Sequence, residues 1–463
     1  MLHDKRGLAV TASSQDAVDA FDAAVEEFLA QGRDAAKIAA RLEAIGPDMI
    51  LGHCLRGYFM CFAARPRNAA MALDCLAAAR ELAGGANDRE RLHVGALAAW
   101  CAGEIRRANA TWEAILVEHP HDLLAIKLAN VMHFYVGDLA HMLHSTARVM
   151  PRWSDAVPGY GYLLGCRAFA FEENGDPATG EPIGRRAVEI NEADIWAGHA
   201  VAHCLETMGR RTDGITWITA HEETWRKSGP FANHLWWHRS LHYLELERYD
   251  EVLAAFDTEF WTAPSEDNTD IGNASSILMR LHMLGVDVGE RWTSVAEVSA
   301  KRVSECVRPF NDLHFIMALA MAGRLEEADR MVDNLRNLAE SRAGTSASAG
   351  DVARDAGFPV AESIVAFARG QHARVVETMM KVRYDMVPLG GSWAQRDVWI
   401  RMLINSAIAD GRHGLARVLL AERVADQPTS GPSWKLYAEA LERCGDVAQA
   451  QTVRAKAASL LAA

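Results

Sequence analysis

Apolar side chains recur at intervals of three and four residues along almost the whole chain, in stretches rich in Ala, Leu, Glu and Arg. This spacing puts the apolar side chains on one face of a helix, and these residue types favour helices. Alternating apolar and polar runs bounded by turn residues, the pattern of a half-buried strand, are hard to find. The sequence therefore predicts an all-α protein.

Glycines interrupt the helical pattern at regular distances and predict helical hairpins. Successive glycines at positions 103, 137, 175 and 209 lie 34, 38 and 34 residues apart, and those at 411 and 445 are again 34 apart. Glycine suits the left-handed residue that ends a helix before a tight turn. This period resembles that of the tetratricopeptide repeat, and so does the motif Gly323-Arg-Leu-Glu-Glu-Ala, with alanine five residues after glycine. The hairpins of such repeats stack into a superhelix with a concave inner wall.

Two stretches depart from the regular pattern. Leu246–Asp250 contains no glycine where a turn is expected, and the Ser-, Ala- and Gly-rich stretch between Glu340 and Gly357 is expected to be a loop. The remaining chain is continuous enough to predict a single tetratricopeptide-like α-solenoid over residues 1–463. Its expected parts are an N-terminal helix and cap (1–33), helical hairpin repeats (34–425) and a C-terminal capping repeat (426–463).

The balance of charge limits the expected partners. The chain has 48 Lys and Arg against 61 Asp and Glu, a net charge of −13 at pH 7, and no basic cluster stands out. Such a surface disfavours nucleic acid and anionic membranes. We recognise neither a signal peptide nor an apolar run near the roughly 20 residues that span a bilayer. The eight cysteines are scattered singly, which is typical of a reducing compartment, so we predict a cytoplasmic protein.

Several segments, read together, resemble the tetratricopeptide repeat protein 38 family of bacteria and animals. The similar segments span nearly the whole chain, which makes the resemblance more specific than any single motif. It implies the helical-repeat fold and leaves the chemistry open. The segments are Leu8–Ser14, Val149–Trp153 through Pro158–Tyr160, His199–His203, Asn233–His238, Phe310–His314 and Gly390–Asp397.

Histidines gather in the middle of the chain, where eight of the 18 fall between residues 199 and 314. His199 and His203 are four residues apart, and Glu206 follows three residues later. A second series, His234, His238 and His242, has the same spacing of four. Because residues three or four apart share a helix face, each series should form a stripe.

The repeat register places the first stripe on the inner wall. With Gly209 as the turn residue, Trp196, His199, His203 and Glu206 all fall at concave positions. Glu172 occupies the position of Glu206 one repeat earlier and should stack beside it. The second stripe lies about one residue off the inner positions.

Imidazoles and carboxylates on facing helices suit acid–base chemistry or a divalent metal ion. The metal is an open question, because a metal-free site in which histidines pair with aspartates fits the sequence as well. Ala200 stands where a zinc protease of the H-E-x-x-H kind has its glutamate. The candidate catalytic residues are His199, His203, His234, His238, Asp312 and His314. The candidate substrate-binding residues are Glu172, Glu206, His242, Asp267, Asp270, Arg280 and Trp237. The candidate metal ligands are His199, His203 and His238.

Two functions are consistent with these residues. The first is a protein that binds a small molecule in a histidine-rich pocket on the concave face. The corresponding activity would be that of a hydrolase acting on a polar or carboxylate-bearing metabolite. The alternative is a non-catalytic tetratricopeptide scaffold that binds a peptide or protein partner in its groove. The Ala-rich C-terminus either caps the solenoid or pairs with a second copy in a homodimer.

Overall fold

The computed structural model describes residues 2–30, 35–229, 231–341 and 348–462. Within these residues the chain is almost entirely helical, which confirms the all-α prediction. One small antiparallel pair of strands, β1 (Leu2–His3) and β2 (Ala9–Val10), lies at the N-terminus with Leu2 opposite Val10. Every helix in the described part of the chain is too short or too polar to cross a membrane.

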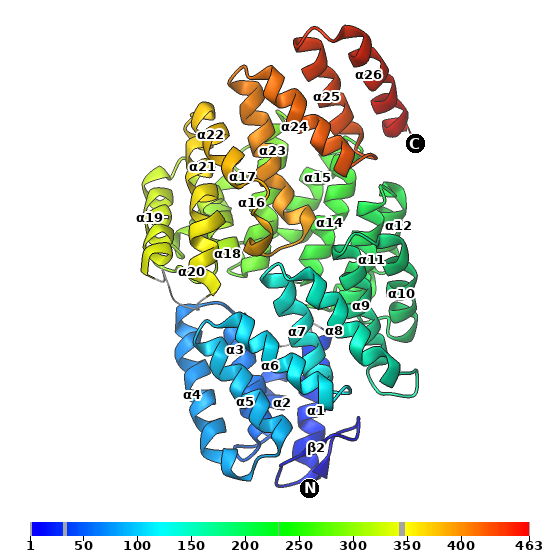
Figure 1. Cartoon of the computed structure of the whole chain (residues 1–463), viewed down its shortest axis with the longest axis vertical. Coiled ribbons are helices and arrows are strands. Elements are labelled where there is room, and N and C mark those ends of the chain that lie inside the picture. The colour runs from blue at the N-terminus through cyan, green and yellow to red at the C-terminus, as the bar shows by residue number, and fades with distance from the viewer. Residues whose placement is uncertain (1, 31–34, 230, 342–347, 463) are drawn as a thin grey trace.

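Most of the helices follow one another as antiparallel hairpins that pack on their neighbours (Figure 1), as α9 does on α10 and α11. The first group comprises α1 (Gln15–Leu29), α2 (Ala35–Ala44), α3 (Ile50–Phe62), α4 (Pro66–Leu82), α5 (Asp88–Cys101), α6 (Ile105–Glu118), α7 (Leu123–Tyr135) and α8 (Leu139–Val149). The middle group comprises α9 (Tyr160–Glu173), α10 (Pro177–Ile190), α11 (Ile195–Thr207), α12 (Arg211–Ala220), α13 (Glu222–Trp225), α14 (Phe231–Glu245), α15 (Tyr249–Ala255), α16 (Asn268–Met283) and α17 (Arg291–Ala300).

The last group leads to the C-terminus, at the opposite end of the long axis from the N-terminus (Figure 1). It comprises α18 (Pro309–Met321), α19 (Leu325–Ser341), α20 (Ser348–Val352), α21 (Phe358–Ala368), α22 (His372–Val382), α23 (Trp393–Ala409), α24 (His413–Asp426), α25 (Gly431–Arg443) and α26 (Val447–Ala462). Single turns of 3-10 or π-helix are η1 (Ala83–Gly85), η2 (Met150–Arg152), η3 (Phe256–Phe260), η4 (Ala353–Gly357) and η5 (Val387–Leu389).

The prediction of a loop between Glu340 and Gly357 is wrong in part. Residues 348–357 form α20 and the π-helical turn η4, and Ala353, Ala356 and Gly357 in that turn are buried. The small side chains of this segment let it pack closely on its neighbours. The same Ala- and Gly-rich composition that is typical of loops therefore occurs here in a tightly packed helical segment. Residues 342–347 of the expected loop lie outside the described residues.

Each predicted hairpin turn is closed by a residue with positive φ. All seven predicted turn glycines have φ between 69° and 87°. At Gly209 the amide donates to the carbonyl of Glu206 and the following amide to that of Leu205, the hydrogen bonds of a Schellman motif. In the repeat without glycine, Glu247 takes the same conformation at φ 55° and its turn has the same bonds. The backbone motif therefore persists even where the preferred residue is missing.

The superhelix closes on itself at several junctions, where segments far apart in the sequence meet. At one junction Arg65 at the start of α4 pairs with Glu266 at 3.1 Å, before α16. At another junction, the C-terminal end of α7 lies close to Gly390, the residue that follows η5. A Cβ at Gly390 would lie 2.6 Å from the carbonyl oxygen of Tyr135, the last residue of α7. Helix α23 packs against α16 and crosses the inner side of the middle repeats (Figure 1).

Backbone strain at the turns can be tested with two exposed glycines of one hairpin. Gly411 is a turn residue with φ 71°, whereas Gly414 lies in α24, and a Cβ would meet no atom within 4 Å at either. We expect Gly411→Ala to lower the free energy of unfolding by about 1 kcal/mol, because an L side chain is strained in the left-handed region. The matched Gly414→Ala should raise it by about 0.5–1 kcal/mol. Urea denaturation measures both, and equal effects would contradict the assignment of the turn.

Candidate functional site

Helices α11 and α14 supply the two predicted histidine stripes. Every residue of α11 from Ile195 to Glu206 is buried. Small residues allow this close packing: the ring of Trp225 lies so near Gly198 that a Cβ there would be 2.3 Å from it. Asp194 caps the helix by accepting a hydrogen bond from the amide of Ala197. Both stripes thus lie on helices whose residues are almost all buried.

Four of the five histidines converge into one cluster, which we call the histidine cluster. Each of its members offers a ring nitrogen, and these four atoms lie within 4.8 Å of one another. The ring centroids of His203 and His238, on different helices, are 4.3 Å apart. The ring of Trp237 stacks on that of His234 at 5.1 Å and closes one side. The cluster comprises His199, His203, His234 and His238, so all three predicted metal ligands lie in it.

The outward-facing nitrogens of the cluster meet oxygen atoms of neighbouring helices. The Nδ1 of His238 lies 3.1 Å from Glu206 Oε2, and that of His234 lies 2.9 Å from Asn273 Oδ1. The Nδ1 of His203 is 3.4 Å from Oε2 of Glu172. Glu172 also accepts a hydrogen bond from the Thr207 hydroxyl at 2.7 Å, so the predicted stacking of Glu172 and Glu206 beside the histidines is seen in the structure.

Burial makes the histidine cluster electrically neutral at ordinary pH. It holds the pKa of His199, His203 and His238 well below the usual value, and repulsion between the neighbouring rings lowers each pKa further. Burial also lowers the pKa of His234, to about 4. Neutral imidazole is the form that binds metal ions or accepts a proton.

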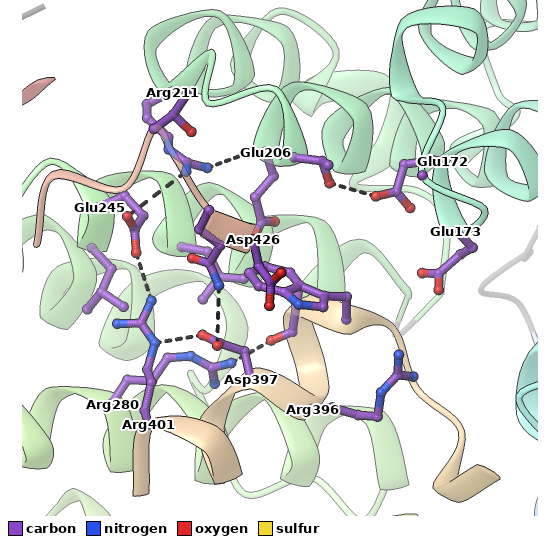
Figure 2. Close-up of a pocket in the computed structure, with 18 of the residues that line it drawn as sticks. Glu172, Glu173, Glu206, Arg211, Glu245, Arg280, Arg396, Asp397, Arg401 and Asp426 are labelled. Carbon is purple, nitrogen blue, oxygen red and sulfur yellow. Dashed lines mark hydrogen bonds and ion pairs between the residues drawn. The ribbon is translucent and has the colours of Figure 1, made fainter. Parts of the chain in front are cut away.

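A polar cavity of about 360 Å³ lies beside the cluster, between the middle helices and α23. Its wall is densely charged, as Figure 2 shows. Arg401 pairs with Asp397 at 2.6 Å and with Glu245 at 2.7 Å, which joins α23 to α14. The charged lining residues are Glu172, Glu173, Glu206, Arg211, Glu245, Arg280, Arg396, Asp397, Arg401 and Asp426.

Arg396 faces Glu172 and Glu173 across this cavity without pairing with either (Figure 2). Its guanidinium donates to the carbonyl of Gly391 and forms no ion pair with a carboxylate of the described residues. Burial raises the pKa of Glu173 to about 7 and that of Glu172 well above its usual value. One oxygen of Glu173 has no hydrogen-bond partner in the described chain. The cavity thus holds unpaired groups of both kinds.

A second cavity, the aromatic cavity, of about 300 Å³, lies on the other side of the cluster. His199, His203 and His234 line it. Its apolar wall includes rings from both the N-terminal and the middle helices: Phe28, Phe59, Phe62, Phe134, Tyr135, Trp196, Phe231 and Phe310. The histidine cluster therefore lies between a charged and an aromatic cavity.

The fifth histidine of the stripes points elsewhere. His242 is fully buried, and its ring lies so close to Gly214 of α12 that a Cβ there would be 2.1 Å from Nε2. Neither of its ring nitrogens has a hydrogen-bond partner in the described part of the chain. His242 lines neither cavity, in contrast to the substrate contact expected from sequence.

Four further predicted residues have local partners outside the cluster. Asp267 is the N-cap of α16, and Asp270 accepts hydrogen bonds from Asn233 and Ser265. Asp312 accepts from the thiol of Cys306, and the Nδ1 of His314 lies 2.8 Å from the carbonyl oxygen of Phe310 in its own helix. None of these four lines the polar cavity.

Arg280 and Trp237, predicted to bind substrate, lie close to the site. Arg280 lines the polar cavity and donates to the carbonyls of Ser276 and Ala394, and burial lowers its pKa to about 10. The Trp237 indole donates to Ser276 Oγ at 3.1 Å. Sequence reasoning missed Glu173, Asn273 and Arg401. Of these only Arg401 carried a signal, its spacing of four from Asp397 on one helix.

No family model matches the chain. Among solved structures, it is similar to the human IFIT1 dimer with m7Gppp-AAAA, at 12% identity, a TM-score of 0.38, and coverage of 98% of this chain and 96% of that one. The human IFIT1 dimer with PPP-AAAA gives 12% identity, a TM-score of 0.39 and the same coverage. The structure of Naa15/Naa10 bound to HypK-THB gives 11% identity and a TM-score of 0.25, over 81% of this chain and 64% of that chain.

These likenesses concern the fold alone, and the all-α fold of this chain rests on its own helices and hairpin turns. The resemblance to the tetratricopeptide repeat protein 38 family is supported at that coarser level only. At TM-scores below 0.5 the neighbours carry no argument about the ligand of this chain. The expected exclusion of nucleic acid rests on net charge and stays a prediction.

The ion pairs of Arg401 should contribute strongly to stability. We expect Arg401→Met to lower the free energy of unfolding by about 3 kcal/mol, because it leaves the buried Glu245 and Asp397 carboxylates short of a cation. The control Arg417→Met breaks an exposed pair with Asp446 and should cost less than about 1 kcal/mol. Denaturant titration measures both, and a similar small loss in both variants would contradict this role.

The same junction should make the protein sensitive to acid. Arg401 and Arg211 lower the pKa of Glu245 from 4.5 to about 2 against the effect of burial. Its stabilisation is therefore complete above about pH 4.5 and is lost as the pH falls towards 2, by on the order of 3 kcal/mol. In Glu245→Gln the midpoint of thermal unfolding should fall less steeply over this range than in the unmodified protein. Parallel pH profiles would contradict the assignment.

Proposed function

We propose that the protein binds a small polar molecule that carries a carboxylate, in the polar cavity at the centre of its superhelix. The observation that carries this proposal is Arg396, a guanidinium that is about nine-tenths buried yet unpaired with any carboxylate of the described residues. Burial of a cation without a direct ion pair is costly, and Glu172 and Glu173 act on Arg396 only at longer range. A ligand carboxylate would supply that partner through the two parallel hydrogen bonds that arginine favours.

The opposite wall of the cavity suits a hydrogen-bond donor on the same molecule. Glu172 and Glu173 face Arg396, and one oxygen of Glu173 has no hydrogen-bond partner in the described chain. An amine or hydroxyl placed there would satisfy this oxygen. A cavity of about 360 Å³ lies near the lower end of the range for small-molecule sites, so we infer a compact ligand.

The proposal stops at binding. Neither the site geometry nor the comparisons support the hydrolase activity predicted from the sequence, so no reaction is assigned. The scaffold alternative remains a second candidate, since the rings of the aromatic cavity suit an apolar side chain of a bound peptide. Against it, the charged groups are concentrated in one polar cavity between the middle helices and α23.

Thermal unfolding with a panel of amino acids, hydroxy acids and dicarboxylic acids tests the proposal. We expect at least one compound to raise the midpoint, because a ligand that binds only the folded state stabilises it. In Arg396→Gln the affinity for that compound should fall at least tenfold by isothermal titration calorimetry.

The matched control is Arg354→Gln, an exposed arginine paired with Asp351 and Asp355. It should bind the compound as the unmodified protein does. Equal binding by Arg396→Gln, or no shift with any compound, would overturn the proposal. Binding to an immobilised peptide array that is lost in Phe231→Ala, without small-molecule binding, would favour the scaffold.

A further inference from the structure

The histidine cluster has the ligand set of a metal site. Its four rings come from two adjacent helices, two at the i and i+4 positions of each. Centroid distances are 4.4 Å between His199 and His203, 4.7 Å between His234 and His238, and 5.0 Å between His199 and His238. Nitrogens bound tetrahedrally at about 2.0–2.1 Å from a metal lie about 3.4 Å apart. The four candidate nitrogens, within 4.8 Å of one another, need to move inward by little more than 1 Å.

The inner nitrogens of the cluster have no other use in the described chain. Both ring nitrogens of His199, and the Nε2 atoms of His203 and His238, are buried without a hydrogen-bond partner. Each such atom costs free energy in the folded state. Three of the four rings therefore hold a buried nitrogen without a partner, and an ion at the centre of the cluster would satisfy it.

The outer nitrogens are arranged as those of metal-bound histidines are. Metal-ligating imidazoles commonly donate their other N–H to a carboxylate or an amide oxygen, which fixes the tautomer and leaves the lone pair on the inner nitrogen. Glu206 is placed to accept from His238, and Asn273 to accept from His234, each through Nδ1. Glu172 lies beside Nδ1 of His203. Three of the four rings are thus oriented with Nε2 inward.

The geometry points to a binding site for one divalent transition-metal ion, held by the imidazoles of His199, His203, His234 and His238. An all-nitrogen ligand set selects ions such as Zn²⁺, Co²⁺, Ni²⁺ or Cu²⁺ over Mg²⁺ and Ca²⁺, which prefer oxygen. Three of these histidines line the aromatic cavity, so the cluster borders a cavity as well as packed side chains. The site rests on the histidines alone and does not depend on Arg396.

Metal uptake by the full-length protein tests this inference. The protein is stripped with a chelator, incubated with Zn²⁺ in an excess of Mg²⁺, desalted and measured by plasma mass spectrometry. We expect one tightly held Zn²⁺ per chain and a higher midpoint of thermal unfolding than in the stripped protein. Retention of no more Zn²⁺ than His199→Gln retains would overturn the site.

Two buried histidines provide a matched pair of variants. His199 and His242 are both buried with two unpartnered nitrogens, but only His199 belongs to the cluster. We expect His199→Gln to lower Zn²⁺ affinity at least a hundredfold and His242→Gln to leave it within about twofold. An equal loss in both would overturn the assignment of ligands. Circular dichroism checks that each variant is folded.

Cobalt provides a second measurement that needs no variant. Co²⁺ bound by four ligands without a centre of symmetry absorbs visible light far more strongly than octahedral Co²⁺. We expect the stripped protein to develop this strong absorption at one equivalent of Co²⁺ and to lose it on addition of Zn²⁺. Weak absorption of the octahedral type would overturn the four-imidazole site even if His199→Gln does not fold. The variant Arg396→Gln should keep the metal, so this test and that of the small-molecule site fail separately.

Discussion

Polar groups removed from water must find partners, and this requirement governs the interior of the protein. Four buried imidazole rings lie packed together on two adjacent helices. The Nδ1 atoms of His238, His234 and His203 lie near Glu206, Asn273 and Glu172. In contrast, both nitrogens of His199 and the Nε2 atoms of His203 and His238 are buried without a hydrogen-bond partner in the described chain. Fully satisfied polar networks rigidify a core, whereas partly satisfied ones are unstable. A bound ion and a bound ligand are the two partners that would complete this interior.

The interior exists because the superhelix closes. Hairpins that only stacked would leave an open concave wall, and the polar side chains of α11 and α14 would be exposed to solvent. The crossing of α23 changes this, since Arg401 on that helix binds Glu245 on α14 and Asp397 on its own helix. The charges that hold the superhelix closed also form the wall of the polar cavity. The residues that stabilise this junction therefore also line the cavity in which we propose that a ligand binds.

Local features of this structure could be predicted from sequence, and long-range ones could not. The turn glycines were found because their left-handed backbone excludes most other residues, yet Glu247 shows that the turn can form without one. The series of histidines four residues apart was extended one residue too far. Each step of four overshoots a helical turn by about 40°, so His242 lies about 80° around α14 from His234 and faces α12 instead. The approach of Arg396 and Arg401 to the middle repeats depends on closure of the superhelix, and no local pattern encodes it.

The most direct test of a metal ion in the histidine cluster is X-ray absorption spectroscopy at the zinc edge of the Zn²⁺-bound protein. We predict that the Zn²⁺ ion has a first shell of four nitrogen atoms at about 2.0–2.1 Å, with the outer-shell scattering of imidazole rings. A shell of oxygen atoms, or one with fewer than three imidazoles, would contradict a metal ion bound by the histidine cluster.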